Sequence, residues 1–372
     1  MTMDADLYYD FQVNNFEQNR PRRQVKPRVY LERPDPRQLM SEQEFKRHFR
    51  FSKASVNRLT EMLENDLSFE TNRGLPISPP LQILITLNHY AGGHFQRITG
   101  WCAGVSQNGA RLSLERVTEA LVKRKPQFVY MPNENTMQKT SERMQAKFHL
   151  PRLAMAVDGC QVVFTSAPRK LPANKVAQMF WCRKQEYALN VQLVGNDVFI
   201  YDLDVGWPGG THDARIWNRS RVKRHIELQK RFLLAGDSGY PISENLVKPY
   251  PIAETANDPL KRLFNSRLSG ARTMMSECLF GVWKARFPIL KNLRTHFPLS
   301  QKIVVATAVL FNIARLWQDE DMEDGEEDSD DEEDQDGGGR ADQVVVHDEV
   351  SATVRLRGQL LREKLKDEMP PR

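Results

Sequence analysis

Three acidic residues in this sequence stand within or beside apolar segments, where a negative charge is unfavourable unless a cation or hydrogen-bond donors pair with it. Asp158 interrupts an apolar run that covers residues 154–164. Asp237 closely follows the apolar run 232–235, and Glu277 lies early in a segment whose apolar residues recur at helical spacing. An unpaired carboxylate in an apolar core costs several kcal/mol. Turn chemistry is the alternative for Asp237, because Asp, Ser and Gly are ordinary turn residues.

Grouped acids of this kind indicate divalent-metal chemistry. Neighbouring carboxylates repel and raise one another's pKa, and a divalent cation removes that conflict. Mg²⁺ and Mn²⁺ prefer carboxylate oxygens, and two such ions about 4 Å apart can activate a water molecule and stabilise a leaving oxygen. That is the chemistry of phosphodiester cleavage. Spacing alone does not bring Asp158, Asp237 and Glu277 together, so three unrelated turn or cap acids remain an alternative.

The elements that would position these acids belong to an α/β pattern. Short runs rich in Val, Ile, Tyr and Phe predict strands over 153–164, 187–195, 197–206 and 231–237. Helical patterns follow over 258–267, 274–290 and 300–317. Lys284, seven residues after Glu277, falls on the same helical face. The last amphipathic pattern, 351–369, predicts one more helix.

Helical signals dominate the preceding segment, from about 40 to 125. Ser41 followed by Glu44 predicts a capping box, and Ser52, Ser78 and Ser106 stand at further helix starts. A short helix near 95–104, a glycine turn and a helix from 106 resemble a helix-turn-helix. In that arrangement base edges would be contacted by Gln107, Asn108 and Arg111, and phosphates by Lys123, Arg124 and Lys125. A plain helical bundle is the alternative, since Gly109 weakens the second helix.

The charge of the chain is divided very unevenly. Residues 319–336 carry 14 acids and no Lys or Arg, whereas the whole chain has a net charge of +5. The remainder is therefore strongly basic, which favours nucleic acid as a partner over a merely soluble basic protein. The acidic run is too charged to pack, so we expect it to be disordered. It could shield the basic surface, bind histone-like partners, or be simply solvated.

Compartment signals point to the inside of the cell. The four cysteines, Cys102, Cys160, Cys182 and Cys278, are scattered, which argues against a disulfide framework and against a zinc site of paired cysteines. No secretory signal is evident at the N-terminus, and no apolar run approaches the roughly 20 residues that span a bilayer. We expect a nuclear protein, with the cytoplasm as a second location, and no membrane partner.

Four motifs, in order, resemble those of one known family. They read AVDGC (156–160), WPGGTHDARIW (207–217), LLAGDSGYP (233–241) and ECLFGVWKARF (277–287). This order is similar to that of the PIF/Harbinger transposase superfamily, and in particular of the Harbinger transposase-derived nucleases. The resemblance extends over the preceding helical segment and covers roughly residues 40–317. Four motifs over that length are far more specific than a single acidic turn.

The resemblance implies an RNase H-like catalytic domain with an Asp-Asp-Glu triad, preceded by an all-α, helix-turn-helix-like domain. Matched motif by motif, the catalytic and metal-binding acids are Asp158, Asp237 and Glu277, with Lys284 as the following basic residue. An Arg four residues before the Glu belongs to the pattern, but here Arg272 stands five before it. Either a small insertion shifts this Arg or its contact with substrate is lost, so it is left out of the catalytic set. A serine before the Leu189-Asn190 pair is also missing. His212 could contact substrate, and for both His212 and Asp213 a polar turn is the alternative.

The implied activity is that of a DNA endonuclease using Mg²⁺ or Mn²⁺. The alternative is a domesticated DNA- or chromatin-binding protein that keeps the triad without cutting. Two-component systems of this family also imply a Myb/SANT-like protein partner, which the helix 351–369 or the N-terminal arm could dock; self-association is left open. The expected domains are a basic arm, a helical domain, the nuclease domain, an acidic linker and a tail with one helix: 1–37, 38–148, 149–318, 319–340 and 341–372.

Overall fold

The computed structural model describes residues 33, 35–71, 75–228, 231–319 and 352–370. Nearly all of the predicted basic arm and of the acidic linker falls outside these residues, so both remain predictions. Residues Pro34–Arg372 form one compact unit. The domain boundaries expected from the sequence likewise stay a prediction.

The segment before the sheet is helical throughout its described part. Its helices are α2 (Pro36–Leu39), α3 (Glu42–Phe49), α4 (Lys53–Leu67), α5 (Pro79–Gly92), α6 (Gln96–Cys102), α7 (Gln107–Lys123), α8 (Lys125–Phe128) and α9 (Glu134–Phe148). The expected capping box is present, since Ser41 accepts from the Glu44 backbone N–H and Glu44 accepts from that of Ser41. Ser106 caps α7 through the Gly109 N–H. These side chains satisfy backbone donors that a helix start leaves open.

A five-stranded mixed sheet follows. Its strands are β1 (Leu153–Phe164), β2 (Tyr187–Gly195), β3 (Ile200–Pro208), β4 (Leu233–Ala235) and β5 (Leu246–Val247), in the order β3-β2-β1-β4-β5. β1, β2 and β3 pair antiparallel, whereas β4 runs parallel to β1 and β5 runs parallel to β4. The long central strand β1 is thus flanked by one antiparallel and one parallel neighbour. This confirms a mixed α/β architecture.

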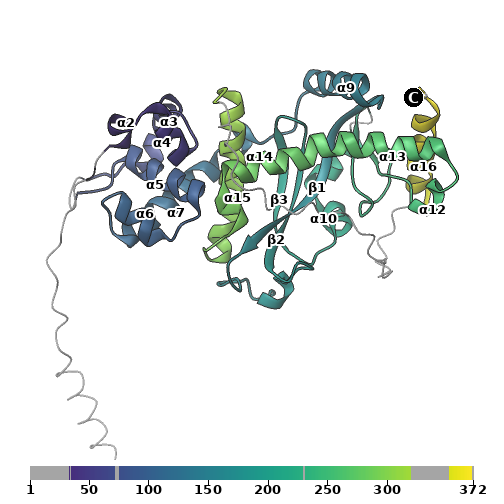
Figure 1. Ribbon diagram of the computed structural model, residues 1–372. Coiled ribbons are helices and arrows are strands. Elements are labelled where there is room, and N and C mark those ends of the chain that lie inside the picture. Colours follow the sequence, from purple (N-terminus) through teal and green to yellow (C-terminus); the bar gives the residue numbers. More distant parts are fainter. Residues whose placement is uncertain (1–32, 34, 72–74, 229–230, 320–351, 371–372) are drawn as a thin grey trace, which may run out of the picture. The chain divides into compact units, whose positions relative to one another are not determined.

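The remaining helices lie between β3 and β4 or follow β5 in the sequence. They are α10 (Asp213–Arg219), α11 (Arg221–Leu228), α12 (Ile252–Thr255), α13 (Pro259–Arg272), α14 (Cys278–Arg286), α15 (Phe297–Leu316) and α16 (Ala352–Asp367), with 3-10 turns at Ala177–Phe180 and Pro288–Lys291. A π-helical turn, Thr273–Glu277, joins α13 to α14. Figure 1 shows this continuous helix crossing one face of the sheet, and the π turn contacts both β1 and β2.

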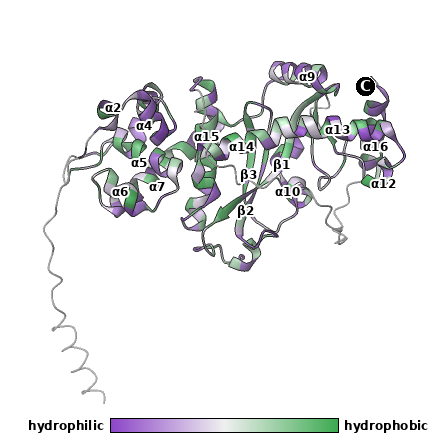
Figure 2. Ribbon diagram, in the orientation of Figure 1, coloured by the Kyte–Doolittle hydropathy of each residue, from purple (hydrophilic) through white to green (hydrophobic). Residues whose placement is uncertain are grey.

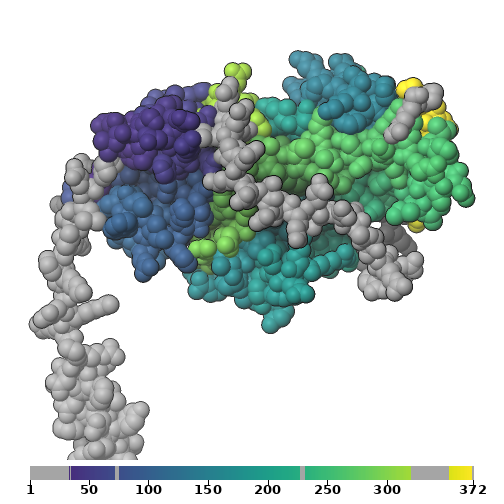
Figure 3. Space-filling model, in the orientation of Figure 1, coloured from purple at the N-terminus to yellow at the C-terminus, as the bar shows by residue number. Residues whose placement is uncertain are grey.

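Helix α15 lies in a core that the helical segment and the sheet share. One cluster of buried residues includes Leu59 of α4, Leu121 of α7, Val191 of β2 and Val309 of α15. Figure 2 shows the apolar residues concentrated in α15 and the strands, and in Figure 3 atoms of α15 reach the visible face where the helical segment meets the sheet. Both parts therefore bury their apolar surface against the same helix.

By length and composition, α15 could also cross a membrane, which the sequence analysis did not anticipate. In the structure 78% of its apolar window is buried inside the protein. Asn312, in the C-terminal part of the helix, hydrogen-bonds the backbone of Ile200 in β3 and donates to the Phe128 carbonyl. A buried amide with protein partners on this helix is what a core helix requires. The expectation of no membrane partner is untested.

Some elements differ from the sequence prediction. β1 and β2 have the predicted bounds, but the two-residue strand β5 and the helix α9 were not predicted. Met144 of α9 packs in a cluster with Leu153 and Ala156 of β1, so α9 covers the sheet although it precedes it in sequence. β5 is too short for a periodicity of two to be visible.

Helix α16 is present where the last amphipathic pattern predicted a helix, and it packs against β5 and α13. Leu365 is buried in the same cluster as Val247 of β5 and Phe264 of α13. Gly358 lies against the backbone of Ser243, where an added Cβ would stand 2.8 Å from backbone atoms. The side of this helix that carries Gly358 and Leu365 is therefore covered by the chain itself, whereas Leu356 and Leu360 are exposed.

Asp319, the first residue of the acidic run, is buried rather than solvated. Its carboxylate accepts from the Ser52 N–H and hydroxyl at 2.9 Å, and the Lys46 ammonium lies 3.0 Å away. Arg286 of α14, also buried, donates to the Arg50 carbonyl and lies 3.7 Å from the carboxylate. The end of α15 is thereby joined to α3, α4 and α14. The prediction of a disordered run was wrong for this one residue.

We expect Asp319→Asn to lower the free energy of unfolding by about 3 kcal/mol at pH 7, because it leaves two largely buried cations without their anion. Burial alone would raise the pKa of Asp319, but hydrogen bonds from serines and Lys46 outweigh it and hold the pKa below its ordinary value. The stabilisation is therefore complete above the ordinary pKa and is lost as the pH falls through the lower, folded-state value. Urea unfolding at pH 7 and at acidic pH measures both effects.

The matched control is Glu64→Gln on the exposed side of α4, which should change stability by less than about 0.5 kcal/mol. Equal effects of the two substitutions would show that Asp319 is not a structural anchor.

Candidate active site

Two of the three predicted acids lie at equivalent distances beyond a pair of residues on neighbouring strands, Asp158 within β1 and Asp237 just after β4. Ala156 of β1 pairs with Ala235 of β4 in a parallel register. Asp158 and Asp237 each follow two residues later, so the direction of the chain carries both acids to the same region of the sheet. Their charges interact, and the negative charge of Asp237 contributes to a raised pKa of Asp158.

The third acid, Glu277, is connected to Asp158 through Arg272. The Arg272 guanidinium donates from Nη1 to Asp158 Oδ2 at 2.8 Å, and its Nη2 lies 2.6 Å from Glu277 Oε1. The Ser276 hydroxyl also donates to Asp158 Oδ2, at 3.0 Å, and Thr273 donates to Glu277 Oε2 at 2.9 Å. One cation thus lies between two of the acids.

The π turn explains how Arg272 reaches this place. The Cys278 N–H bonds to the Thr273 carbonyl, an i→i+5 bond that takes in one residue more than an α-helical turn. Arg272 and Glu277 are five residues apart, a spacing that would point them to different sides of a regular α-helix. With the extra residue absorbed, Arg272 reaches both Asp158 and Glu277. The π turn fits the small insertion that the sequence left open, and it keeps Arg272 in contact with Asp158, while its exclusion from the catalytic set stays a prediction.

A fourth carboxylate, that of Asp213, lies close to this group. It begins α10, and its Oδ1 accepts from Asn190 Nδ2 at 3.0 Å. A Cβ added to Gly159, next to Asp158, would stand 2.5 Å from the same oxygen, so only glycine allows this approach. Burial, and to a smaller extent Asp237, raises the pKa of Asp213. His212, which the sequence analysis preferred, is exposed at the start of α10.

Burial dominates the electrostatics of Asp158. It raises the pKa of Asp158 to about 6, against the opposing effects of Arg272, Ser276 and the Gly159 N–H. The side chain is only 12% exposed. A carboxylate held in this way binds a cation readily, because any nearby positive charge offsets its desolvation.

A divalent ion suits the chemistry of this donor set. The described residues include no group of three or more His, Cys, Asp or Glu already placed to hold one ion. The Arg272 guanidinium lies between Asp158 and Glu277, where it supplies the positive charge that these oxygens require. Carboxylate oxygens are the ligands that Mg²⁺ and Mn²⁺ prefer, and Asp237 and Asp213 carry further oxygens beside them.

The other predicted contact residues are distributed over two regions. Lys284 lies near the buried thiol of Cys160 on β1; burial raises the pKa of that thiol and Lys284 lowers it in part. On α7, Arg111 donates to Asn108 and to both oxygens of Glu115, while Gln107 lies at the start of the helix. Their contact with DNA stays a prediction.

The proposed phosphate contacts at the end of α7 already have partners in the protein. Lys123 and Arg124 both pair with Asp66, and Lys125 donates to the Leu203 carbonyl. These three residues hold the helices to one another and to β3. Any role in binding phosphates stays a prediction.

Helix α16 also comes close to Asp237. A cavity of about 450 Å³ is lined by Gly239 and Tyr240, by Lys248, and by Arg355 and Arg362 of α16. Lys248 donates to the Ser238 carbonyl at 3.0 Å. Sequence reasoning could not place these basic side chains beside Asp237, since α16 follows more than a hundred residues later.

Comparisons with known proteins show the family of this chain. Residues 157–312 match the family described as DDE superfamily endonuclease, a range that includes all three acids. The protein named "Putative nuclease HARBI1" from Rattus norvegicus is 31% identical over 285 residues, which cover 74% of this chain and 77% of that protein. The Homo sapiens protein of that name is 30% identical with the same coverage, and the Xenopus laevis one is 26% identical over 273 residues.

The chain belongs to the Harbinger transposase-derived nucleases. Endonucleases of the DDE superfamily generally use divalent metals, in keeping with the carboxylates found here. Among solved structures, the Mos1 transposase paired-end complex with left transposon end aligns over 86% of this chain and 89% of that one, at 11% identity. The TM-score is 0.19, which is too low to establish a common fold. Within this Harbinger-derived chain, the π turn at Thr273–Glu277 accommodates the shifted arginine.

We expect Arg272→Met, measured by urea unfolding in EDTA, to lower the free energy of unfolding by about 3–5 kcal/mol, because Asp158 loses its cation. In the Asp158→Asn background the same substitution should cost much less, so the double-mutant cycle should give a coupling of about 1–3 kcal/mol. Arg272→Lys is the control that keeps the charge but cannot bridge two acids. Additive effects would contradict the bridge.

The pH dependence of the wild type follows from the same group. Because the folded-state pKa of Asp158 is raised from 3.8 to about 6, its ionisation disfavours the folded state. Ionisation of Asp158 should therefore lower the free energy of unfolding as the pH rises from about 4 to 6. The stability of Asp158→Asn relative to the wild type should rise over that interval, as measured by unfolding at pH 4.5 and pH 7. A relative stability that does not change would contradict the assignment.

Proposed function

We propose that the protein is a metal-dependent DNA endonuclease of transposase origin that hydrolyses phosphodiester bonds with Asp158, Asp237 and Glu277. The observation that carries this proposal is the convergence around Asp158. Asp237 follows the adjacent parallel strand β4, two residues beyond the Ala156–Ala235 pair, and Glu277 shares the Arg272 guanidinium with Asp158. Membership of the Harbinger transposase-derived nucleases supports a nuclease over other metal-dependent activities.

An RNase H-like catalytic fold is part of the proposal. The family resemblance implies that the three acids stand on the first strand, on a later strand and on a following helix. Asp158 lies on the first strand β1, Asp237 follows β4, and Glu277 ends the π turn before α14. The sheet with β1 at its centre supports the same fold.

Two Mg²⁺ or Mn²⁺ ions, when bound by these acids, would supply the positive charge and the activated water that phosphodiester hydrolysis needs. The protein's own residues prepare the acids. Ser276 and the Gly159 N–H each donate to Asp158 and fix its orientation. Asn190 holds the Asp213 carboxylate beside Gly159. Arg272 compensates the charge of Asp158 and Glu277 and can turn to a substrate phosphate, which also accepts a bidentate guanidinium.

The partner and location remain proposals from the sequence. The strongly basic remainder of the chain supports DNA as a partner and the nucleus as the location. A Myb/SANT-like protein would supply sequence recognition. Since one side of α16 is covered by β5 and α13, its exposed side chains, Leu356 and Leu360 among them, are the part of the helix that could dock such a partner.

Cleavage of a supercoiled plasmid with Mg²⁺ or Mn²⁺ tests the activity. We expect the wild type to cut, and Asp237→Asn to lose at least about a hundredfold in rate because a metal ligand is removed. Glu61→Gln, on the exposed face of α4, is the matched control and should cut normally. Cutting by Asp237→Asn at the wild-type rate, or no cutting with any divalent ion, would refute the nuclease.

A protein that binds DNA or chromatin without cutting is the second candidate. The observation that favours it is that Arg272 already balances the charge of Asp158 and Glu277 without a metal. It predicts salt-dependent DNA binding that is unchanged by Asp158→Asn and Asp237→Asn, together with no increase of the melting temperature on addition of Mn²⁺. A nuclease should instead gain stability with Mn²⁺, and Asp158→Asn should remove that gain.

A further inference from the structure

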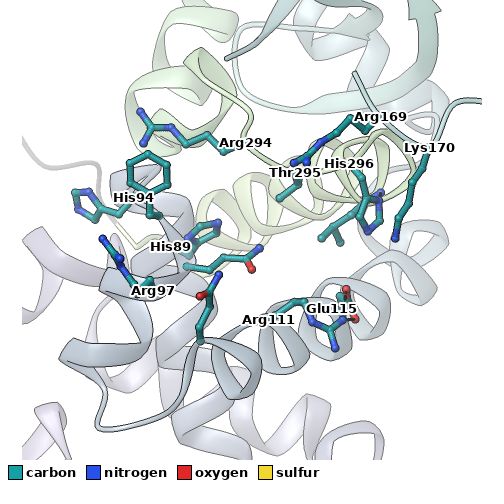
Figure 4. Close-up of a pocket in the computed structure, with 14 residues that line it drawn as sticks. His89, His94, Arg97, Arg111, Glu115, Arg169, Lys170, Arg294, Thr295 and His296 are labelled. Carbon is teal, nitrogen blue, oxygen red and sulfur yellow. Dashed lines mark hydrogen bonds and ion pairs between the residues drawn. The ribbon is translucent and has the colours of Figure 1, made fainter. Parts of the chain in front are cut away.

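A second concentration of basic side chains surrounds a cavity of about 820 Å³, between the helical segment and the loops beyond the end of β1. Its permanent cations are Arg97, Arg111, Arg169, Lys170 and Arg294. Figure 4 shows them on different sides of one hollow, with Arg169 and Lys170 across from Arg97, and Arg111 on α7. They come from four separate stretches of the chain, so the fold rather than a local charge run gathers them.

The acidic side chains near this hollow do not neutralise its positive charge. Glu115, the single carboxylate that lines it, accepts from Arg111 through both of its oxygens at 2.7 Å. Within the described ranges no acid pairs with the remaining four cations, Arg97, Arg169, Lys170 and Arg294. Four positive charges in one hollow repel one another, and a polyanionic ligand would relieve that repulsion.

Arg294 is held in a way that prepares it for an anion. Its guanidinium lies 4.4 Å from the ring centroid of Phe95, which is itself 59% exposed. Among the described residues its buried Nε–H has no hydrogen-bond acceptor. An arginine stacked on an aromatic ring keeps its in-plane donors free, which suits bidentate contact with phosphate.

Burial and the neighbouring positive charges both lower the pKa of two histidines in the hollow. Burial, followed by the charges of His94 and Arg294, lowers the pKa of His89 to about 4. Burial and then Lys170 lower the pKa of His296, whose Nδ1 accepts from the Leu299 N–H. Both imidazoles are therefore neutral near pH 7.

This hollow is distinct from the acid site. Asp158 lies six residues before the end of β1 at Phe164, about 20 Å along the strand. Arg169 and Lys170 follow beyond that end, and Leu293, next to Arg294, pairs with Phe164 there. The cations therefore lie at the end of β1 that is remote from the acids.

We propose that the hollow formed by Arg97, Arg111, Arg169, Lys170 and Arg294 is a second nucleic-acid site, which binds backbone phosphates of the DNA at a distance from the acids. The proposal rests on the proposed function, in that DNA is the substrate. Phosphate is the ligand chemistry, and it could come from a nucleic-acid backbone or from a free phosphate anion. Contacts with backbone phosphates add affinity and position rather than sequence recognition, and the base contact predicted for Arg111 is separate from this role.

Fluorescence anisotropy with a labelled 30-base-pair duplex tests the site, with the full chain in EDTA and over a series of salt concentrations. We expect Arg97→Gln/Arg169→Gln to reduce the slope of log K against log salt by about two and to weaken binding about tenfold. The matched control, Lys139→Gln/Arg224→Gln, removes the same charge from exposed positions on α9 and α11. It should change binding less than threefold.

A second arm adds inorganic phosphate and measures the melting temperature and competition with the duplex. Equal loss of DNA binding in the two double variants would overturn the proposal. Stabilisation by millimolar phosphate that is lost in Arg97→Gln/Arg169→Gln, with unchanged DNA binding, would also overturn it and assign the hollow to free phosphate. If the double variant does not fold, Lys170→Gln alone should reduce the slope by about one. Because EDTA prevents metal-dependent cutting, a failure of the nuclease proposal leaves this result interpretable.

Discussion

The charge of Asp158 inside the sheet is the constraint on which the site depends. A carboxylate on a buried central strand is unfavourable unless a cation and hydrogen-bond donors surround it, and Arg272, Ser276 and the Gly159 N–H take those places. The continuous helix from α13 to α14 supplies two of these three groups as well as Glu277. The position of that helix across the sheet is therefore coupled to the same charge that would hold a metal ion.

The sequence predicted much of this arrangement for reasons that can be stated. β1 and β2 are long and mostly apolar, so their bounds were right, and the acids were singled out because each stands within or beside an apolar run. The position of Arg272 was left open between a small insertion and a lost contact, because a spacing of five residues excludes a common helical face unless a π turn intervenes, and nothing in the sequence TMMSE signals such a turn. Asp213 was left undecided because its neighbour Gly159 is distant in sequence, and only the fold shows their approach.

The helical segment and the sheet are interdependent through α15. Residues of α4 and α7 pack on one helix that also packs against the strands, and Asn312 on that helix binds the backbone of β3 and of α8. The hollow lined by Arg97, Arg169 and Arg294 exists only because these parts meet. The arrangement of the basic side chains therefore depends on the same core that joins the helical segment to the sheet.

The anchoring of Asp319 and of α16 has a consequence for the acidic run between them. Asp319 is bound by Ser52 and Lys46, and α16 is packed against β5 and α13, so residues 320–351 connect two fixed points of one body. A protease that cut this connection would release nothing at once, because both pieces would stay associated through buried contacts. The docking of α16 beside Asp237 would nevertheless change from an intramolecular equilibrium to a bimolecular one, and dilution alone could then separate the helix from the nuclease.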